Sequence, residues 1–206
     1  MKYLLLTTIA VLTFSCNSAQ NSAKQKLSRV DYMNTITAED LSTHLYKFSD
    51  DKMQGRMTGE AGQKMAAEYL KNFYIAQGIA APKDVEEYFQ VIPASYLKRL
   101  KEPKDSENVL AFIEGSEKPD EIIILSAHYD HVGMEDGEIY NGADDDGSGT
   151  VALLEIAEAF QKAVKNGQGP KRSILFLHVT GEEIGLFGSK YYTENPIFPL
   201  ANTVCN

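Results

Sequence analysis

Residues 122–127 (IIILSA) and residues 173–179 (SILFLHV) decide the fold class. Both are continuous apolar runs of strand length, the pattern of strands that are buried on both faces of a sheet. Residues 149–164 lie between them and have a helical pattern, whose polar side chains fall on one narrow stripe: Glu155, Glu158, Lys162 and Lys165. A strand, a mostly buried helix and a second strand form a βαβ unit. The sequence therefore predicts an α/β fold, with a mixed, largely parallel sheet sandwiched by helices.

The N-terminal half of the chain supplies further elements. Thr37 is a predicted N-cap for a helix that begins at residue 38. A second helix is predicted over residues 60–77, with Gly78 as its C-terminal stop and one apolar face, made by Ala66, Leu70, Phe73 and Gln77. Short strands are predicted over residues 88–92 and 108–113.

Potential ligands follow the two strands of the βαβ unit. His128, Asp130 and His131 come at the end of the first strand, and Glu182 and Glu183 follow the second. Carboxyl ends of parallel strands share one edge of a sheet, so these side chains are expected to meet there. Because side chains alternate along a strand, Asp130 is on the same side as His128 and can orient its imidazole. His131 either lines the site or faces solvent.

The loop at residues 144–146, three consecutive aspartates before the long helix, favours a bound cation. Adjacent carboxylates repel one another unless a cation or a proton compensates them. Imidazole and carboxylate groups suit a borderline metal such as zinc, and a pair of ions needs a negative bridge. The acidic residues are consecutive and no Glu follows at the twelfth position, so the loop is not an EF-hand. Three carboxylates would repel a phosphate group. The sequence has no Gly-x-Ser-x-Gly motif, which argues against a serine hydrolase.

Three segments together resemble the M28 family of zinc aminopeptidases: SAHYDHVG at 126–133, NGADDDGSG at 141–149 and TGEEIGLFGS at 180–189. The upstream segments GRMTGEAGQKMAAEYLKNF and NVLAFIEG are also similar to that family. The resemblance covers residues 37–200. It implies the zinc-dependent exopeptidase fold, also called phosphorylase/hydrolase-like, with peptides as substrates and two Zn²⁺ ions in the complete family member.

The resemblance also implies a role for each matching residue. His128 matches a zinc ligand, and Asp130 matches the carboxylate that supports it. Asp145 matches the bridge between the zincs, Glu182 the general base and Glu183 a zinc ligand. Asp144 departs from the family, because an Asn is common at its position.

The family supplies two more ligands, an Asp and a distant His, after the Glu-Glu pair, and neither residue type occurs after Glu183. Residues 31–206 are accordingly expected to be the N-terminal portion of a zinc peptidase domain, incomplete at the C-terminus. Three hypotheses for the function stay open. The protein is an aminopeptidase, a glutaminyl-cyclase-like acyltransferase, or an inactive remnant.

The first residues have the pattern of an export signal. Lys2 and an apolar run over residues 4–14 precede Ser15-Cys16. Residues 1–16 are interpreted as a lipoprotein-type signal peptide with Cys16 as the lipid-anchored residue, and ordinary signal cleavage is the alternative. Residues 17–30 would be a flexible tether, and the protein would face the periplasm or the cell surface of a bacterium.

The net charge and the cysteine content limit the possible partners and the possible sources of stability. The net charge of −9 argues against a nucleic-acid partner, because phosphate binding requires a basic surface. Only two cysteines occur, and a lipid on Cys16 would leave Cys205 without an intramolecular partner. The fold must therefore be stabilised by the packing of its core, to which a bound metal could add.

Overall fold

The structure, a computed structural model, describes residues 26–206. The predicted signal peptide, the lipidation site Cys16 and residues 17–25 of the predicted tether lie outside the described residues. Within the expected tether, Leu27 is hydrogen-bonded to Gln168 and the first helix begins at Arg29. None of the described helices is long and apolar enough to cross a membrane.

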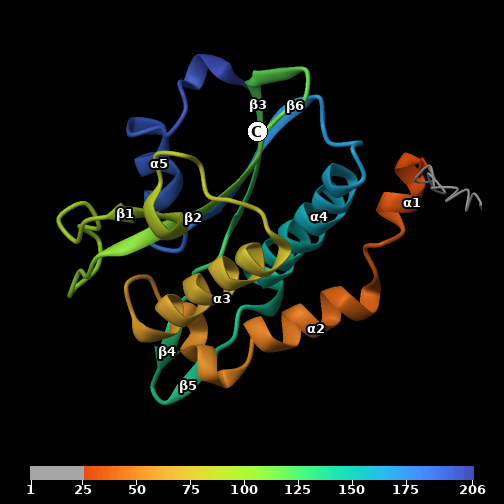
Figure 1. Ribbon diagram of the computed structural model, residues 1–206. Coiled ribbons are helices and arrows are strands. Elements are labelled where there is room, and N and C mark those ends of the chain that lie inside the picture. The colour runs from red at the N-terminus through yellow and green to blue at the C-terminus, as the bar shows by residue number, and fades with distance from the viewer. Residues whose placement is uncertain (1–25) are drawn as a thin grey trace, which may run out of the picture.

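In the described chain, α1 to α3 precede the strands β1 to β5, and α-helices and strands alternate from α4 onward (Figure 1). The helices are α1 (Arg29–Met33), α2 (Ala38–Phe48), α3 (Ala61–Gln77), α4 (Ser148–Lys165) and α5 (Phe187–Glu194). The strands are β1 (Phe89–Ile92), β2 (Ser106–Ile113), β3 (Lys118–His128), β4 (Gly133–Glu135), β5 (Glu138–Tyr140), β6 (Arg172–Val179) and β7 (Thr203–Cys205). Short helical turns occur at η1 (Asp51–Arg56), η2 (Glu86–Tyr88), η3 (Ala143–Gly147) and η4 (Leu200–Asn202).

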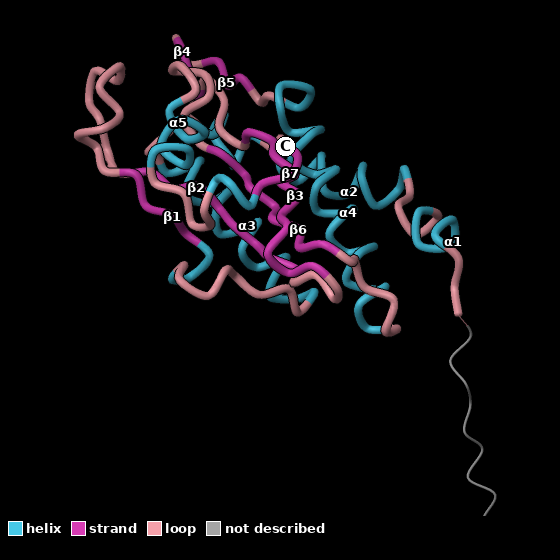
Figure 2. Tube along the Cα trace, turned by 90° about the horizontal axis from the view of Figure 1, so that it is seen from above, coloured by secondary structure: helices cyan, strands magenta, loops and turns pink. Residues whose placement is uncertain are grey.

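Five strands form one sheet in the order β1-β2-β6-β3-β7, which can be followed in Figure 2. β3 pairs with β6 in parallel through the α4 crossover, and this confirms the predicted βαβ unit. β7 is also parallel to β3, whereas β1 and β2 pair in antiparallel fashion. The sheet is therefore mixed, and its parallel part carries the predicted ligands.

Helices cover both faces of the sheet, as the sequence predicts. One face packs Val109, Ala127 and Phe176 against α2, α3 and α4. The opposite face packs Leu110, Ile124, Leu175 and other apolar side chains against α5 and the segment that follows it. Figure 1 shows α2, α3 and α4 together on one side and α5 on the other. Because side chains alternate along β2 and β6, each of these strands contributes residues to two apolar cores, one on each face of the sheet.

The ends of the helices follow local sequence rules. Thr37 caps α2 by accepting a hydrogen bond from the Asp40 N–H. Gly78 ends α3 with φ of 73°, a left-handed conformation that glycine adopts without a steric penalty from a β-carbon. Both predicted boundaries are confirmed.

One detail of the predicted pattern is wrong. Glu155 was expected on the polar stripe of α4, but it is only 3% exposed and its carboxylate lies 3.2 Å from His44 Nε2. The His44 Nδ1 also contacts the Tyr69 hydroxyl, at 2.6 Å. α2 and α3 cover this part of α4, and helical periodicity alone does not reveal such packing between helices.

Candidate metal centre

The predicted ligands meet at the carboxyl ends of β3 and β6. His128 ends β3, and its Nε2 lies 2.9 Å from Asp145 Oδ1 and 3.9 Å from Glu182 Oε2. His131 Nδ1 lies 2.6 Å from Glu183 Oε1, so His131 lines the site rather than facing solvent. Among the described residues, two groups have ligand atoms within 4.8 Å of one another: His128, Glu182 and Glu183, and His131, Asp145 and Glu183.

These two groups fit zinc by their chemistry. Imidazole nitrogens and carboxylate oxygens are the donors that zinc takes in protein sites, and here they come from three separate loops. Glu183 belongs to both groups, and Asp145 contacts His128 while belonging to the group of His131. Two carboxylates therefore lie between the histidines, where a pair of cations would need negative charge.

Asp130 is completely buried behind His128. The His128 Nδ1 lies 3.1 Å from the Asp130 carbonyl oxygen and 3.7 Å from its carboxylate. The carboxylate accepts hydrogen bonds from the Thr58 hydroxyl, at 2.8 Å, and from the Glu182 N–H, at 3.2 Å. Asp130 thus ties the end of β3 to the glutamate loop, and it lies where a group that orients the imidazole is expected.

The electrostatic setting of His128 has a consequence for metal binding. Burial lowers the pKa of His128, but hydrogen bonding and the negative charge of Asp130, aided by Asp146, outweigh it and raise the pKa to about 9. At neutral pH the metal-free imidazole is therefore protonated. A metal ion that binds there must displace this proton, because only the neutral ring donates a lone pair.

The three adjacent aspartates have different surroundings. Asp146 accepts hydrogen bonds from the His128 N–H at 3.2 Å and from the Gly149 N–H at 3.1 Å, so it links the first turn of α4 to the end of β3. Asp144 is exposed. The Asp145 side chain is 69% exposed and points to His128, and the Asp145–Asp146 peptide is cis. Of the three carboxylates, that of Asp145 is the one that contacts the side chain of a predicted metal ligand, His128.

Glycines shape the loop that carries the glutamates. Gly181 has φ of 66°, which lets the chain turn sharply at the end of β6. A β-carbon on Gly188 would lie 2.1 Å from the Thr180 carbonyl oxygen, so only glycine allows α5 to begin this close to β6. The Gly-rich sequence after Glu183 is thus a packing requirement of the loop.

The buried Arg56 is a part of this region that the sequence did not single out. Its guanidinium is fully buried and hydrogen-bonds four backbone carbonyl oxygens around the site. Burial lowers its pKa to about 10, and the charges of Asp130, Asp146 and Glu183 act in the opposite direction. All four acceptors are backbone carbonyls, and because every residue has a carbonyl, the sequence contains no signal of these contacts.

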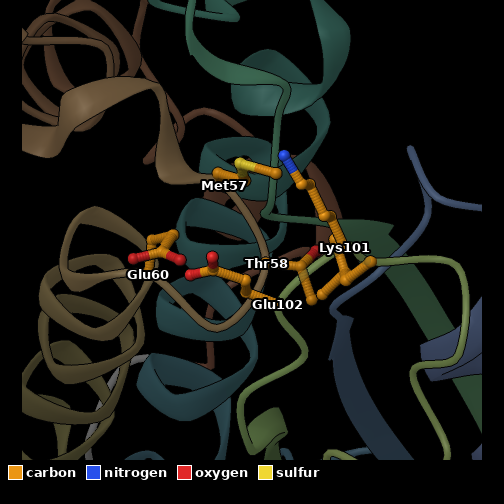
Figure 3. Close-up of a pocket in the computed structure, with 6 residues that line it drawn as sticks. Met57, Thr58, Glu60, Lys101 and Glu102 are labelled. Atoms are coloured by element: carbon orange, nitrogen blue, oxygen red, sulfur yellow. The ribbon is translucent and has the colours of Figure 1, made fainter.

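A cavity of about 180 Å³ lies beside the same turn (Figure 3). Met57, Thr58, Glu60 and Leu100 line it together with Lys101 and Glu102. None of the candidate ligands lines this cavity. The candidate ligands are therefore a different set of residues from those that line this cavity.

His178 has a structural role. It is fully buried in β6, and its Nε2 lies 2.7 Å from the Tyr74 hydroxyl. Burial lowers its pKa to about 3, so the ring is neutral at physiological pH.

Comparison with known proteins identifies the family. The sequence profile of Peptidase family M28 matches residues 108–206, which contain every candidate ligand. Residues 108–206 belong to peptidase family M28. This M28 segment includes β2, β3, α4 and β6, the elements that carry the site.

Relatives with similar sequences have peptidase names. The chain is 41% identical over 88 residues to a probable glutamate carboxypeptidase of Arabidopsis thaliana, covering 43% of this chain and 12% of that protein. It is 38% identical over 104 residues to an aminopeptidase of Rattus norvegicus, covering 50% of this chain and 13% of that protein. A probable zinc metalloprotease of Pyrenophora teres is 35% identical over 127 residues, covering 60% of this chain and 23% of that protein. The matching region spans less than a quarter of each relative.

Solved structures share the M28 fold. A glutaminyl cyclase of Bacteroides thetaiotaomicron has a TM-score of 0.61 at 20% identity, covering 81% of this chain and 59% of that structure. A leucine aminopeptidase precursor of the same organism has a TM-score of 0.59 at 20% identity, with the same coverage. At this identity the likeness shows the fold alone.

Proposed function

We propose that the protein hydrolyses peptide bonds at the N-terminus of peptides with a co-catalytic pair of zinc ions. The observation that carries this proposal is the convergence of His128, His131, Asp145, Glu182 and Glu183 within two overlapping groups of ligand atoms. In this proposal His128, Asp145 and Glu183 hold the ions, with Asp145 between them.

Bound zinc would polarise a carbonyl group and lower the pKa of a water molecule. Glu182 has a half-exposed side chain and lies next to His128 without a short contact to it. Its carboxylate can therefore accept a proton from water and donate it to the departing amine. Asp130 would act through His128 by holding the imidazole in place.

A glutaminyl-cyclase-like acyltransferase is the second candidate, because the same fold occurs in the solved glutaminyl cyclase. The deciding experiment incubates the zinc-loaded protein with aminoacyl peptides and, separately, with peptides that begin with Gln. Release of the first residue supports the aminopeptidase, and loss of ammonia without release supports the cyclase. A purified chain that takes up no zinc and shows neither reaction would support the inactive remnant.

We propose export and lipid anchoring on Cys16 from the sequence of residues 1–16. Metabolic labelling with a fatty acid tests this in a bacterial host. Label in the wild-type protein and none in Cys16→Ser is expected, whereas an unlabelled, shortened wild-type protein would indicate ordinary signal cleavage.

A further inference from the structure

We infer that Arg56 and Thr58, in the turn between α2 and α3, are positioning residues that hold the loops of the candidate metal centre. The expected effect of these residues on zinc binding rests on the proposed function. Their expected effect on the mobility of the loops does not. Both residues precede residues 108–206, the part of the chain that the sequence profile of the family matches. Neither is within the two groups of candidate ligands.

The guanidinium of Arg56 joins three segments through four hydrogen bonds. Nε donates to the carbonyl of Tyr129, at 2.8 Å, which lies between His128 and Asp130. Nη1 and Nη2 donate to the carbonyls of Asn141 and Gly142, both at 2.7 Å, at the start of the aspartate loop. The fourth bond, 2.9 Å long, runs to Phe48 at the end of α2. One planar group thus fixes the spacing between two ligand-bearing loops.

The backbone of the same turn supports the site as well. The His131 N–H donates to the Arg56 carbonyl at 3.2 Å. The Gly142 carbonyl accepts a second hydrogen bond from the Gly147 N–H, at 3.1 Å, which closes the aspartate loop around the Arg56 contact. His131 and the loop of Asp145 are therefore held from one turn.

Thr58 acts on the other side of the site. Its hydroxyl donates to Asp130 Oδ2, while Asp130 Oδ1 accepts from the Glu182 N–H. Thr58 is 2% exposed, so water does not replace this donor readily. Loss of the hydroxyl would leave a buried carboxylate oxygen unsatisfied and free Asp130 to move away from His128.

Lysine cannot take the place of Arg56. Arginine presents five N–H donors in a rigid plane, whereas the ammonium group of lysine is a compact point charge. Arg56→Lys keeps the charge near Asp130, Asp146 and Glu183 but cannot reach carbonyls on three segments. This substitution therefore separates positioning from a simple effect of charge.

The first experiment measures backbone hydrogen exchange in the metal-free full chain. Arg56→Lys is expected to accelerate exchange within residues 128–147, with little change in β2 and β6. The control is Arg172→Lys, at the opposite end of β6, where the arginine pairs with Glu121. Unchanged exchange at 128–147 in a folded Arg56→Lys protein would overturn the inference, whether or not the wild-type protein binds zinc.

The second experiment measures zinc affinity by competition with a chelating dye. Arg56→Lys and Thr58→Val should each weaken zinc binding by about tenfold, the lower end of the effect of removing groups that support metal ligands. Thr58→Ser keeps the hydroxyl and should restore wild-type affinity. If Arg56→Lys does not fold, the comparison of Thr58→Val with Thr58→Ser tests the inference. A Thr58→Val protein that is destabilised but binds zinc like the wild type would show a purely structural role and overturn the inference.

If the wild-type chain binds no zinc, the proposed function fails, and the exchange measurement alone decides the positioning role. Accelerated exchange confined to residues 128–147 would then still support it.

Discussion

Glu182 and Glu183 are neighbours in sequence but have different surroundings. The Glu183 side chain is 19% exposed and contacts His131, whereas that of Glu182 is 36% exposed and its nearest basic group, His128, is 3.9 Å away. A metal ligand must be held in place by its contacts, whereas a general base must be accessible to water. The different surroundings therefore fit the two proposed roles, and matching substitutions of Glu182 and Glu183 can separate them.

Glu182→Gln should lower kcat by about a hundredfold or more, the usual contribution of a general base, and leave zinc content unchanged. Glu183→Gln should lower zinc content as well. Activity on aminoacyl peptides and metal analysis of the dialysed proteins measure the two effects. Loss of zinc in Glu182→Gln would instead identify Glu182 as a ligand.

His178 makes the stability of the protein depend on pH. Its pKa is about 3 in the folded chain and 6.5 in the unfolded chain, because burial disfavours the charged ring. The stabilisation is complete above pH 6.5 and is lost as the pH falls toward 3. Between these values His178 contributes a slope of up to about 1.4 kcal/mol per pH unit to the free energy of unfolding.

His178→Gln keeps a polar partner for Tyr74 but does not titrate. Urea unfolding of the metal-free protein at pH 6.5 and pH 5 should show a smaller decrease in stability for this variant than for the wild type. Equal decreases in the two proteins would contradict the assigned pKa.

At the scale of elements, two glycines of α3 serve different purposes. A β-carbon on Gly62 would lie 2.0 Å from the Met53 carbonyl oxygen, so glycine is needed for η1 to pack on the helix. Gly78 has open space around it, with Gln161 Nε2 at 3.8 Å, and only its left-handed backbone favours glycine.

Gly62→Ala should therefore destabilise the protein by about 2 kcal/mol or more, although alanine is the better helix former. Gly78→Ala should cost about 1 kcal/mol from its backbone conformation alone. Urea unfolding ranks the two variants. A stabilised Gly62→Ala protein would show that η1 can move away from α3.

The sequence predicted elements well where a local signal exists. Alternation and apolar runs identified β2, β3 and β6, and the caps Thr37 and Gly78 identified the ends of α2 and α3. Burial of Glu155 was missed because it depends on contacts with another helix.

The candidate site, too, was predicted where a local signal exists. His128, Asp145 and Glu183 follow strands or precede a helix, so topology alone brings them together. Arg56 was missed because its partners are carbonyls up to 86 positions away in the chain, and every residue has a carbonyl. The roles assigned to the site residues remain predictions.

For the whole molecule, bound zinc should increase the stability of the fold, because the ligands come from three loops that unfolding separates. Zinc at a hundred times its dissociation constant would add about 2.7 kcal/mol to the free energy of unfolding. Thermal unfolding with zinc and with excess chelator measures this difference. Glu183→Gln should unfold at the same temperature in both conditions, and a wild-type shift that persists in this variant would place the bound metal elsewhere.

The dependence of the site on Arg56 bears on how such proteins could recombine. The match to the sequence profile of the family begins at residue 108, yet Phe48, Leu70 and Tyr74 complete the core, and Arg56 spans the ligand loops. An exchange of residues 108–206 between two relatives would transfer all candidate ligands and leave their support behind. Successful chimeras should therefore have a crossover point before α2, so that the turn and the loops it holds are inherited together.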